Sequence, residues 1–375
     1  MKKIIIVPDS FKGTLSSKQI CDIMKKKISA HFSEAEVISI PVADGGEGSV
    51  DCFLNAVGGE LIQCACVNPF FEEMQGFYGI LNKGGTAIIE MASCAGLPLV
   101  EDRKNPMLAT TYGVGLLIQD ALQKGVREII LGLGGSATND FGCGAAAALG
   151  VRFHDAQGEL FIPTGGTLCD VEKIDIDGVD RSFRDIKFTI MCDVQNPVYG
   201  KNGAAYVYAP QKGASQEMVA TLDKGLRHIC DVVQRNLKIE VSDLIGGGAA
   251  GAMAGGMYAF FNAAIRSGID TVLDAVCFDN ILQDADIVFT GEGKIDAQSL
   301  QGKVIAGVAK RARAKSVPVV AIVGGIEGNI APIYELGVNS VFTINRLPED
   351  FSISRYKSEE NLSEAMDNVL RILKI

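Results

Sequence analysis

The chain has 375 residues, which is typical of two or three domains, and its 47% hydrophobic and 21% charged content indicates a folded protein. Its net charge of -10 argues against binding to nucleic acid or to an anionic membrane. Ten cysteines without a C-x-x-C pair indicate neither a zinc site nor a disulfide framework, so we expect a reducing, cytoplasmic location.

The first elements of the chain alternate strand, loop and helix. Apolar runs predict strands at residues 4–8 and 36–42, and helical spacing predicts a helix over residues 16–30. The first strand ends in DSFKGT, residues 9–14, and the second ends in DGGEGS, residues 44–49. A repeated order of strand, loop and helix is typical of a parallel sheet.

The pattern changes between about residue 60 and residue 285. Short alternating runs there (LIQCACV, GFYGIL and TAIIEMA) predict an antiparallel or mixed sheet. The order of strand, loop and helix returns with a strand at 287–290, a helix near 302–315 and a strand at 317–323. A last helix and a strand containing SVFTI follow, so strands of one kind lie at both ends of the chain.

We therefore expect an α/β fold with two domains. Residues 1–65 and 283–375 should form a doubly wound parallel-sheet domain of the Rossmann or flavodoxin type. Residues 66–282 should form an inserted α/β domain with a mixed sheet, and the active site should lie in the cleft between the two. The uncharged residues 244–265 have G-x-x-x-G spacing but are about half Gly and Ala, which favours a tightly packed segment over a membrane span.

Four loops of the terminal domain should meet at the carboxyl edge of its sheet, where open parallel sheets bind ligands. They begin at Asp9, Asp44, Gly291 and Gly324. Their clustered acids would repel one another, and Mg²⁺ with substrate phosphates would relieve that repulsion. The charged residues of this edge would be Asp9, Lys12, Asp44, Glu47, Glu292, Lys294 and Asp296.

Residues 129–144, IILGLGGSATNDFGCG, form a second candidate ligand site. Glycines allow close approach of a ligand, and hydroxyl and amide side chains can donate hydrogen bonds to phosphate. One interpretation is a dinucleotide fingerprint ending at Ala137, with Asp155 as the ribose-binding acid of an NAD-dependent dehydrogenase acting on a small hydroxy acid. Gly142 and Gly144 weaken the helix that this needs. A small-molecule kinase loop and a turn without a ligand are the alternatives.

Two further acids follow apolar runs of the inserted region, Glu90 in IIEMAS and Asp193 after FTIMC. Phosphoryl transfer to a hydroxyl needs phosphates held by N–H groups and lysine, Mg²⁺, and a carboxylate that accepts the hydroxyl proton. The chain has no Walker A motif, because its Gly-Lys pairs precede Asn, Ile and Val. A kinase of this sequence would therefore belong to a family without a P-loop.

Nine motifs in chain order resemble those of type I glycerate kinases, the bacterial glycerate 2-kinase-like family. They are PDSFKGTLSS, PVADGGEGS, EMASCAGL, KNP, TTYG, LGLGGSATND, CDVQNP, PQKGA and GEGKIDAQSLQGK, and they cover nearly the whole chain. The resemblance implies Mg²⁺- and ATP-dependent phosphorylation of D-glycerate, with 2-phosphoglycerate favoured over 3-phosphoglycerate. The chain departs from many members at Gly13-Thr14, Lys294 and Phe141.

The resemblance and the chemistry of the loops together suggest roles. We expect catalytic roles for Asp193 as proton acceptor, Lys12, and Asp296 as second candidate base. Substrate would be bound by Ser10, Asp9, Ser136, Asn139, Asp140 and Glu90. Nucleotide phosphates would be bound by Gly45, Gly46, Gly48, Gly291, Gly293, Lys294 and Gly324, and Mg²⁺ by Asp44, Glu292 and Glu47.

Structural roles are the alternatives at two of these positions. Asp193 could cap the turn at Asn196-Pro197, and Asp9 could cap the first helix. A non-catalytic protein that binds a sugar acid or a nucleotide is the other class of function. We expect glycerate and ATP as small-molecule partners, no nucleic acid or membrane partner, and a monomer or homodimer.

Overall fold

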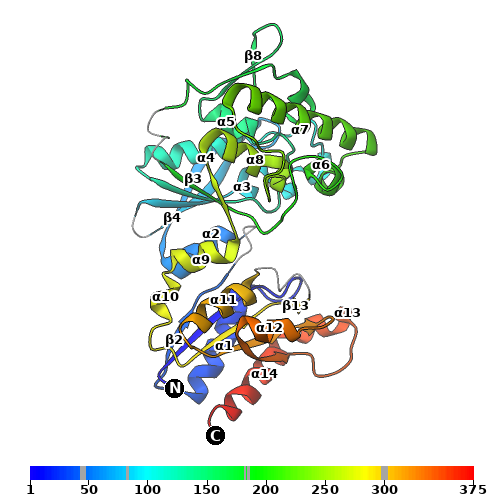
Figure 1. Cartoon of the computed structure of the whole chain (residues 1–375). Coiled ribbons are helices and arrows are strands. Elements are labelled where there is room, and N and C mark those ends of the chain that lie inside the picture. Colours follow the sequence, from blue (N-terminus) through cyan, green and yellow to red (C-terminus); the bar gives the residue numbers. More distant parts are fainter. Residues whose placement is uncertain (43–47, 82–83, 181–182, 184–185, 297–302) are drawn as a thin grey trace. The chain divides into compact units, whose positions relative to one another are not determined.

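The computed structural model describes residues 1–42, 48–81, 84–180, 183, 186–296 and 303–375. The chain divides into two compact units. Unit 1 comprises Met1–Asp44, Asn55–Val57 and Ser267–Ile375, and unit 2 comprises Gly45–Leu54 and Gly58–Arg266. The colours of Figure 1 follow the chain from unit 1 into unit 2 and back.

These bounds differ from the expected boundaries after residues 65 and 282. Strand β3 (Gly59–Val67) is paired along its whole length with β4 (Glu73–Leu81), which places it in unit 2. Helix α9 (Gly268–Ala275) packs against α11 (Val304–Ala314), where a Cβ on Gly307 would lie 2.8 Å from the Ile269 side chain. That packing places α9 in unit 1.

Unit 1 contains a five-stranded, fully parallel sheet in the order β16-β14-β12-β1-β2. In chain order this is the 2-1-3-4-5 arrangement of flavodoxin-like folds, so the predicted doubly wound sheet is confirmed. Its inner strands are almost entirely apolar and buried, as parallel strands covered on both faces must be. The strands are β1 (Lys3–Pro8), β2 (Glu36–Ser39), β12 (Ile287–Gly291), β14 (Val319–Val323) and β16 (Val338–Thr343).

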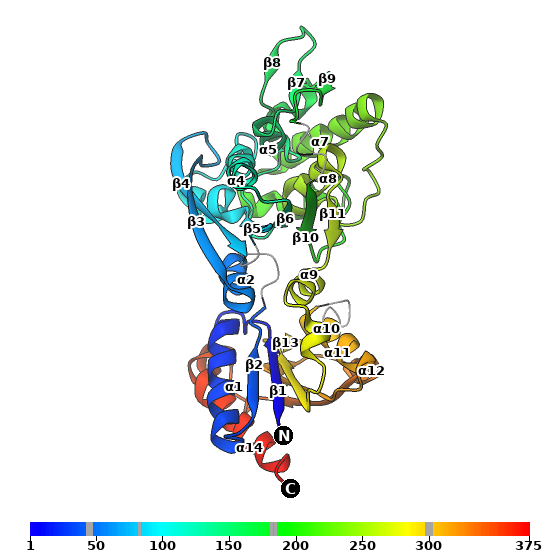
Figure 2. The ribbon, with the colours of Figure 1, turned by 90° about the vertical axis from the view of Figure 1, so that its left-hand side faces the viewer.

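Helices cover both faces of this sheet. Helix α1 (Ser17–His31) packs beside α14 (Ser358–Ile372) on one face, and α11 and α12 (Ala331–Leu336) lie on the other (Figure 2). Helix α1 begins with a capping box, in which Ser16 Oγ accepts from Gln19 N and Gln19 Oε1 accepts from Ser16 N. The remaining elements of unit 1 are α10 (Phe278–Ile281), β13 (Lys294–Ile295), β15 (Gly325–Ile326), α13 (Phe351–Ser354) and η5 (Arg355–Lys357).

Unit 2 contains the predicted mixed sheet, six strands in the order β11-β10-β6-β5-β4-β3. Its β3–β4 hairpin is antiparallel, whereas β5 (Thr86–Glu90), β6 (Glu128–Gly132), β10 (Lys187–Met191) and β11 (Ala264–Arg266) are parallel. The expectation that parallel strands with crossovers resume only near residue 285 is therefore wrong. Long connections between these short strands hide the parallel pattern in the sequence.

The helices of unit 2 connect these strands. A separate antiparallel sheet, β8-β7-β9, is formed by β7 (Arg152–His154), β8 (Leu160–Phe161) and β9 (Lys173–Asp175). Among the described residues, no helix combines the length and apolar character that a bilayer span requires. The helices are α2 (Ser49–Val57), of which Asn55–Val57 belong to unit 1, α3 (Ala92–Ala95), η1 (Leu97–Arg103), α4 (Tyr112–Gln123), α5 (Cys143–Ala148), η2 (Gly165–Asp170), α6 (Ala204–Tyr208), η4 (Pro210–Lys212), α7 (Gln216–Leu237) and α8 (Ala249–Phe261).

The glycines of α8 allow its backbone to pack directly on residues 136–142, the segment that follows β6. A Cβ on Gly251 would lie 2.2 Å from the carbonyl oxygen of Thr138, and one on Gly256 would lie 1.8 Å from that of Phe141. Phe141 N also donates a hydrogen bond of 3.1 Å to the carbonyl oxygen of Gly251. The G-x-x-x-G spacing of residues 244–265 thus serves tight packing inside unit 2.

Replacing Gly256 by alanine should destabilise the protein by about 3 kcal/mol, because the new methyl group meets a backbone carbonyl that cannot rotate away. The midpoint of urea unfolding measures this loss. Gly85→Ala is the matched control, since no heavy atom lies within 4 Å of its added Cβ and its φ is not positive. Equal midpoints for the two variants would contradict the proposed packing.

Candidate functional site

The loops that follow β1 and β12 lie side by side at the carboxyl edge of the unit 1 sheet. Asp9 N donates a hydrogen bond of 2.8 Å to the carbonyl oxygen of Gly291, and a Cβ on Gly293 would lie 3.2 Å from Lys12 N. The chain order reverses between these two strands, so this position is the topological switch point of the sheet. Ligands of doubly wound folds bind at such points.

The loop after β14 joins the same edge. Gly324 N donates to the carbonyl oxygen of Glu292 at 3.1 Å, and a Cβ on Gly324 would lie 2.4 Å from the carbonyl oxygen of Gly293. Three of the four loops expected to converge are thus contiguous. The fourth contains Asp44, Gly45, Gly46 and Glu47, which lie outside the described residues, while Gly48 is the N-cap of α2 with a φ of 88°.

The two lysines at this edge have different surroundings. The ammonium group of Lys294 forms an ion pair with Glu327 and lies 3.9 Å from Asp296 Oδ2, and the bond to Glu327 raises the pKa of Lys294. Lys12 is exposed at the switch point. The ammonium group of Lys294 is thus engaged by carboxylates, and Lys12 lies in the loop that follows β1.

The acids of the edge also differ from one another. Glu292 is 4% exposed, directly after β12. Asp9 Oδ1 accepts from Ser10 N at 2.6 Å and from Ser10 Oγ at 3.4 Å. The N-cap of α1 is Ser16, so Asp9 does not cap that helix.

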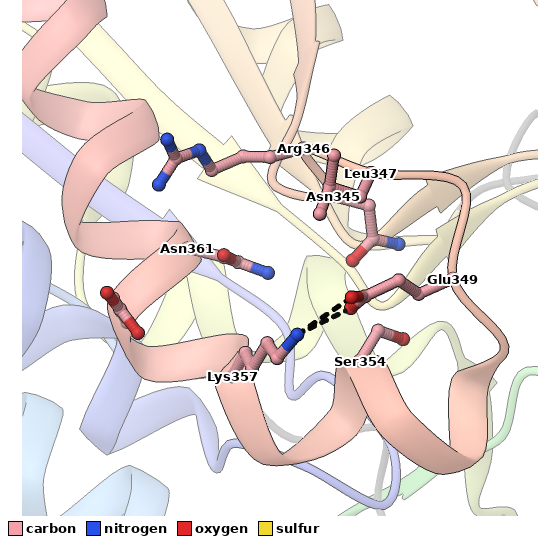
Figure 3. A pocket seen from close by; sticks show the side chains of 8 residues that line it. Asn345, Arg346, Leu347, Glu349, Ser354, Lys357 and Asn361 are labelled. Carbon is pink, nitrogen blue, oxygen red and sulfur yellow. Dashed lines mark hydrogen bonds and ion pairs between the residues drawn. The ribbon is translucent and has the colours of Figure 1, made fainter.

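A cavity of about 380 Å³ adjoins the end of β16 and was not predicted from the sequence (Figure 3). Asn345 Nδ2 donates to the carbonyl oxygen of Gly324 at 2.6 Å, which ties the cavity wall to the loop after β14. Inside it, Lys357 Nζ donates to both carboxylate oxygens of Glu349, at 2.8 and 2.9 Å. Its lining residues are Asn345, Arg346, Leu347, Glu349, Ser354, Lys357, Glu360 and Asn361.

The carboxyl edge of the unit 2 sheet carries the other predicted residues. The register places Glu90, the last residue of β5, beside Gly132 of β6, which in turn pairs with Met191 of β10. Glu90 is 2% exposed, and its Oε1 accepts from Val50 N in the first turn of α2 at 2.5 Å. Asp193 lies two residues beyond β10 and is exposed.

Hydrogen bonds to the carboxylate of Asp140 connect two neighbouring parts of this edge. Its fully buried carboxylate accepts from Thr111 N at 2.7 Å, Thr111 Oγ1 at 2.8 Å, Gly142 N at 3.1 Å and Gly144 N at 3.3 Å. Burial raises the pKa of Asp140, and these hydrogen bonds oppose that rise. The carboxylate therefore links the beginning of α4 to that of α5.

Lys212 belongs to the same site and was not singled out from the sequence. It is 2% exposed, and its Nζ donates to Ser136 Oγ at 2.8 Å and to the carbonyl oxygen of Thr138 at 2.7 Å. Burial lowers the pKa of Lys212 to about 7, and the negative charge of Asp140 acts in the opposite direction. The signal available in the sequence was a lysine beside a glycine in PQKGA.

The dinucleotide interpretation of residues 132–155 is wrong. Asp155 lies in the turn of the separate β7–β8 hairpin, where its Oδ1 accepts from Gln157 N and Glu159 N, both at 2.9 Å. A ribose-binding acid follows the second strand of the same parallel sheet. Helix α5, moreover, spans only Cys143–Ala148, too short for the crossover helix of that motif.

Comparisons with known proteins agree on one family. Residues 4–374 match a family model described as the glycerate kinase family. The chain is 41% identical to a glycerate kinase of Bacillus cereus and 39% identical to the glycerate 2-kinase of Escherichia coli, in each case over 100% of this chain and 98% of the relative. A crystal structure described as that of a glycerate kinase 2 from Salmonella typhimurium LT2 has a TM-score of 0.88 and 38% identity, covering 100% of this chain and 98% of that one. The chain belongs to the glycerate kinase family.

Proposed function

We propose that the protein transfers the terminal phosphoryl group of ATP to D-glycerate and forms 2-phosphoglycerate in preference to 3-phosphoglycerate. The observation that carries this proposal is the contact of three glycine-rich loops at the switch point of the unit 1 sheet, beside the exposed Lys12. Backbone N–H groups and a lysine are what a polyphosphate requires. The relative named glycerate 2-kinase supports the choice of product.

The nucleotide phosphates would bind at the edge of unit 1. We assign them to the N–H groups around Gly291, Gly293 and Gly324, to Lys12, and to Lys294 after exchange of its carboxylate partner. Gly45, Gly46 and Gly48 would complete this set from the loop after β2. The cavity beside Asn345 extends this edge and offers room for the remainder of the nucleotide.

Mg²⁺ fits this arrangement, because the phosphate oxygens of the bound nucleotide would supply some of its ligands. Among the described residues, no group of three His, Cys, Asp or Glu side chains could hold a metal ion. Kinase Mg²⁺ needs only one or two carboxylates, because phosphate oxygens and water supply its other ligands. Glu292 offers such an oxygen ligand, and Asp44 and Glu47 are the further candidates; the ion would neutralise phosphate charge.

Glycerate would bind at the edge of unit 2. Ser136, with Asn139, offers hydrogen-bond donors, and Glu90 and Asp140 support the surrounding loops through the contacts described above. Ser10 and Asp9 are the candidates from unit 1. Asp193 would accept the proton of the reacting hydroxyl, with Asp296 as the second candidate.

The ten cysteines form no disulfide, which supports a cytoplasmic location.

The protein incubated with Mg²⁺, ATP and D-glycerate should release ADP, and removal of divalent ions by EDTA should abolish that release until Mg²⁺ is restored. Phosphorus NMR of the product should show a doublet, because the phosphate of 2-phosphoglycerate couples to one proton on C2. A triplet would instead identify 3-phosphoglycerate. Reduction of NAD by glycerate without ADP release would contradict kinase activity, and the absence of both reactions would favour a non-catalytic binding protein.

A further inference from the structure

The environment of Lys212 is unusual for a cation. Lysine is seldom fully buried unless it is paired with an acid, yet no carboxylate of the described residues forms an ion pair with the Lys212 ammonium group. Its two hydrogen bonds go to a hydroxyl and to a backbone carbonyl, both in the segment that follows β6. Burying a lysine without an acid costs free energy, which favours a role beyond packing.

The direction of the bond to Ser136 follows from the chemistry of the ammonium group. Below about pH 7, where Lys212 is protonated, it has three donors and no acceptor, so Ser136 Oγ must accept the hydrogen bond of 2.8 Å from Lys212. The hydroxyl hydrogen of Ser136 is then available to donate to another group. A donor next to a cation suits an anion.

The neighbouring side chains supply a second, independent observation. Asn139 is fully buried, and neither its Oδ1 nor its Nδ2 has a hydrogen-bond partner among the described residues. Thr138 Oγ1 also has none there. Unsatisfied buried polar groups cost free energy, so native proteins rarely retain them without a reason. Polar groups that a bound ligand satisfies would explain them.

We propose that Lys212 is a positioning residue that fixes Ser136 as a hydrogen-bond donor to a small carboxylate, with Asn139 as a second donor. On the proposed function, which this inference requires, that carboxylate is the carboxylate of glycerate. The bond from Lys212 to the carbonyl oxygen of Thr138 holds the backbone of the segment in the same arrangement. Lys212 therefore acts through Ser136 and does not need to touch the substrate.

The test compares Lys212→Met, Ser136→Ala and the double variant at a pH below 7, where Lys212 is protonated. Each single substitution should raise KM for glycerate about tenfold while KM for ATP stays within twofold of the wild type. The double variant should be no worse than the worse single variant, because both substitutions remove one interaction. A hundredfold rise in the double variant, or an unchanged KM in either single variant, would overturn the inference. Lys224→Met, on the exposed surface of α7, is the matched control.

A second pair of variants keeps the test decisive where Lys212→Met fails to fold. Ser136→Thr retains a hydroxyl and should keep KM for glycerate within about threefold, in contrast to Ser136→Ala. Wild-type protein that releases no ADP would overturn the proposed function. The stabilisation of ATP-free protein by D-glycerate against heat then decides the inference: no stabilisation of the wild type, or equal stabilisation of wild type and Ser136→Ala, overturns it.

Discussion

Replacing Asp193 by asparagine should lower kcat for glycerate phosphorylation by at least roughly a hundredfold, because the amide retains the shape of the carboxylate but cannot accept a proton. Asp193 is exposed, and it follows the end of β10 by two residues. Adjacent β6 leads into the segment that carries Ser136. KM for ATP should change little, since the nucleotide is assigned to unit 1. ADP release at saturating substrate gives the measurement.

Asparagine keeps the size of the aspartate side chain and can still accept a hydrogen bond, so the fold should tolerate this substitution. The turn at Asn196-Pro197 is held by bonds of Asn196 itself: its Nδ2 donates to Asn202 O at 2.7 Å, and its Oδ1 accepts from the Tyr208 hydroxyl at 2.6 Å. Asp155→Asn is the matched control, because it changes an acid in the β7–β8 turn and should leave kcat within about twofold. Turnover of Asp193→Asn within tenfold of the wild type would exclude Asp193 as the base and direct attention to Asp296.

The sequence was most informative where local chemistry decides the structure. Strand β1 and helix α1 were predicted nearly to their ends, because an apolar run and the capping signal of Ser16 are both local. The convergence of the loops at Asp9, Gly291 and Gly324 was predictable as well, since parallel strands must place their carboxyl ends at one edge. The order of strands and helices therefore predicted the position of this site better than any single motif did.

The features that could not be predicted from the sequence depend on contacts between residues that lie far apart in the chain. The bond between Glu90 and Val50 N joins residues 40 positions apart, and nothing near either residue indicates it. The pairing of β3 with β4 likewise places β3 in unit 2, whereas the boundary expected after residue 65 had placed most of this strand in the terminal domain. Lys212 bonds to the segment after β6, more than 70 positions earlier in the chain, so its motif, PQKGA, resembles an ordinary exposed turn.

The buried amine of Lys212 should make the stability of the protein depend on pH in a predictable direction. Burial lowers the pKa of Lys212 to about 7, against 10.5 for an ordinary lysine. Between these values the unfolded chain binds one more proton than the folded chain, so the free energy of unfolding rises with pH. The contribution is complete above pH 10.5 and is lost as the pH falls to about 7.

Lys212→Met removes the amine that binds this proton. The difference in unfolding free energy between wild type and variant therefore measures the contribution of Lys212 protonation alone. That difference should rise in favour of the wild type by about 1.4 kcal/mol per pH unit, or about 3 kcal/mol from about pH 7.5 to about pH 9.5. Urea unfolding across this range measures it. Lys201→Met should give a constant difference, since that side chain is exposed in the folded chain as in the unfolded one. A constant difference for Lys212→Met as well would mean that the negative charge of Asp140 outweighs the effect of burial, so that Lys212 keeps its proton in the folded chain.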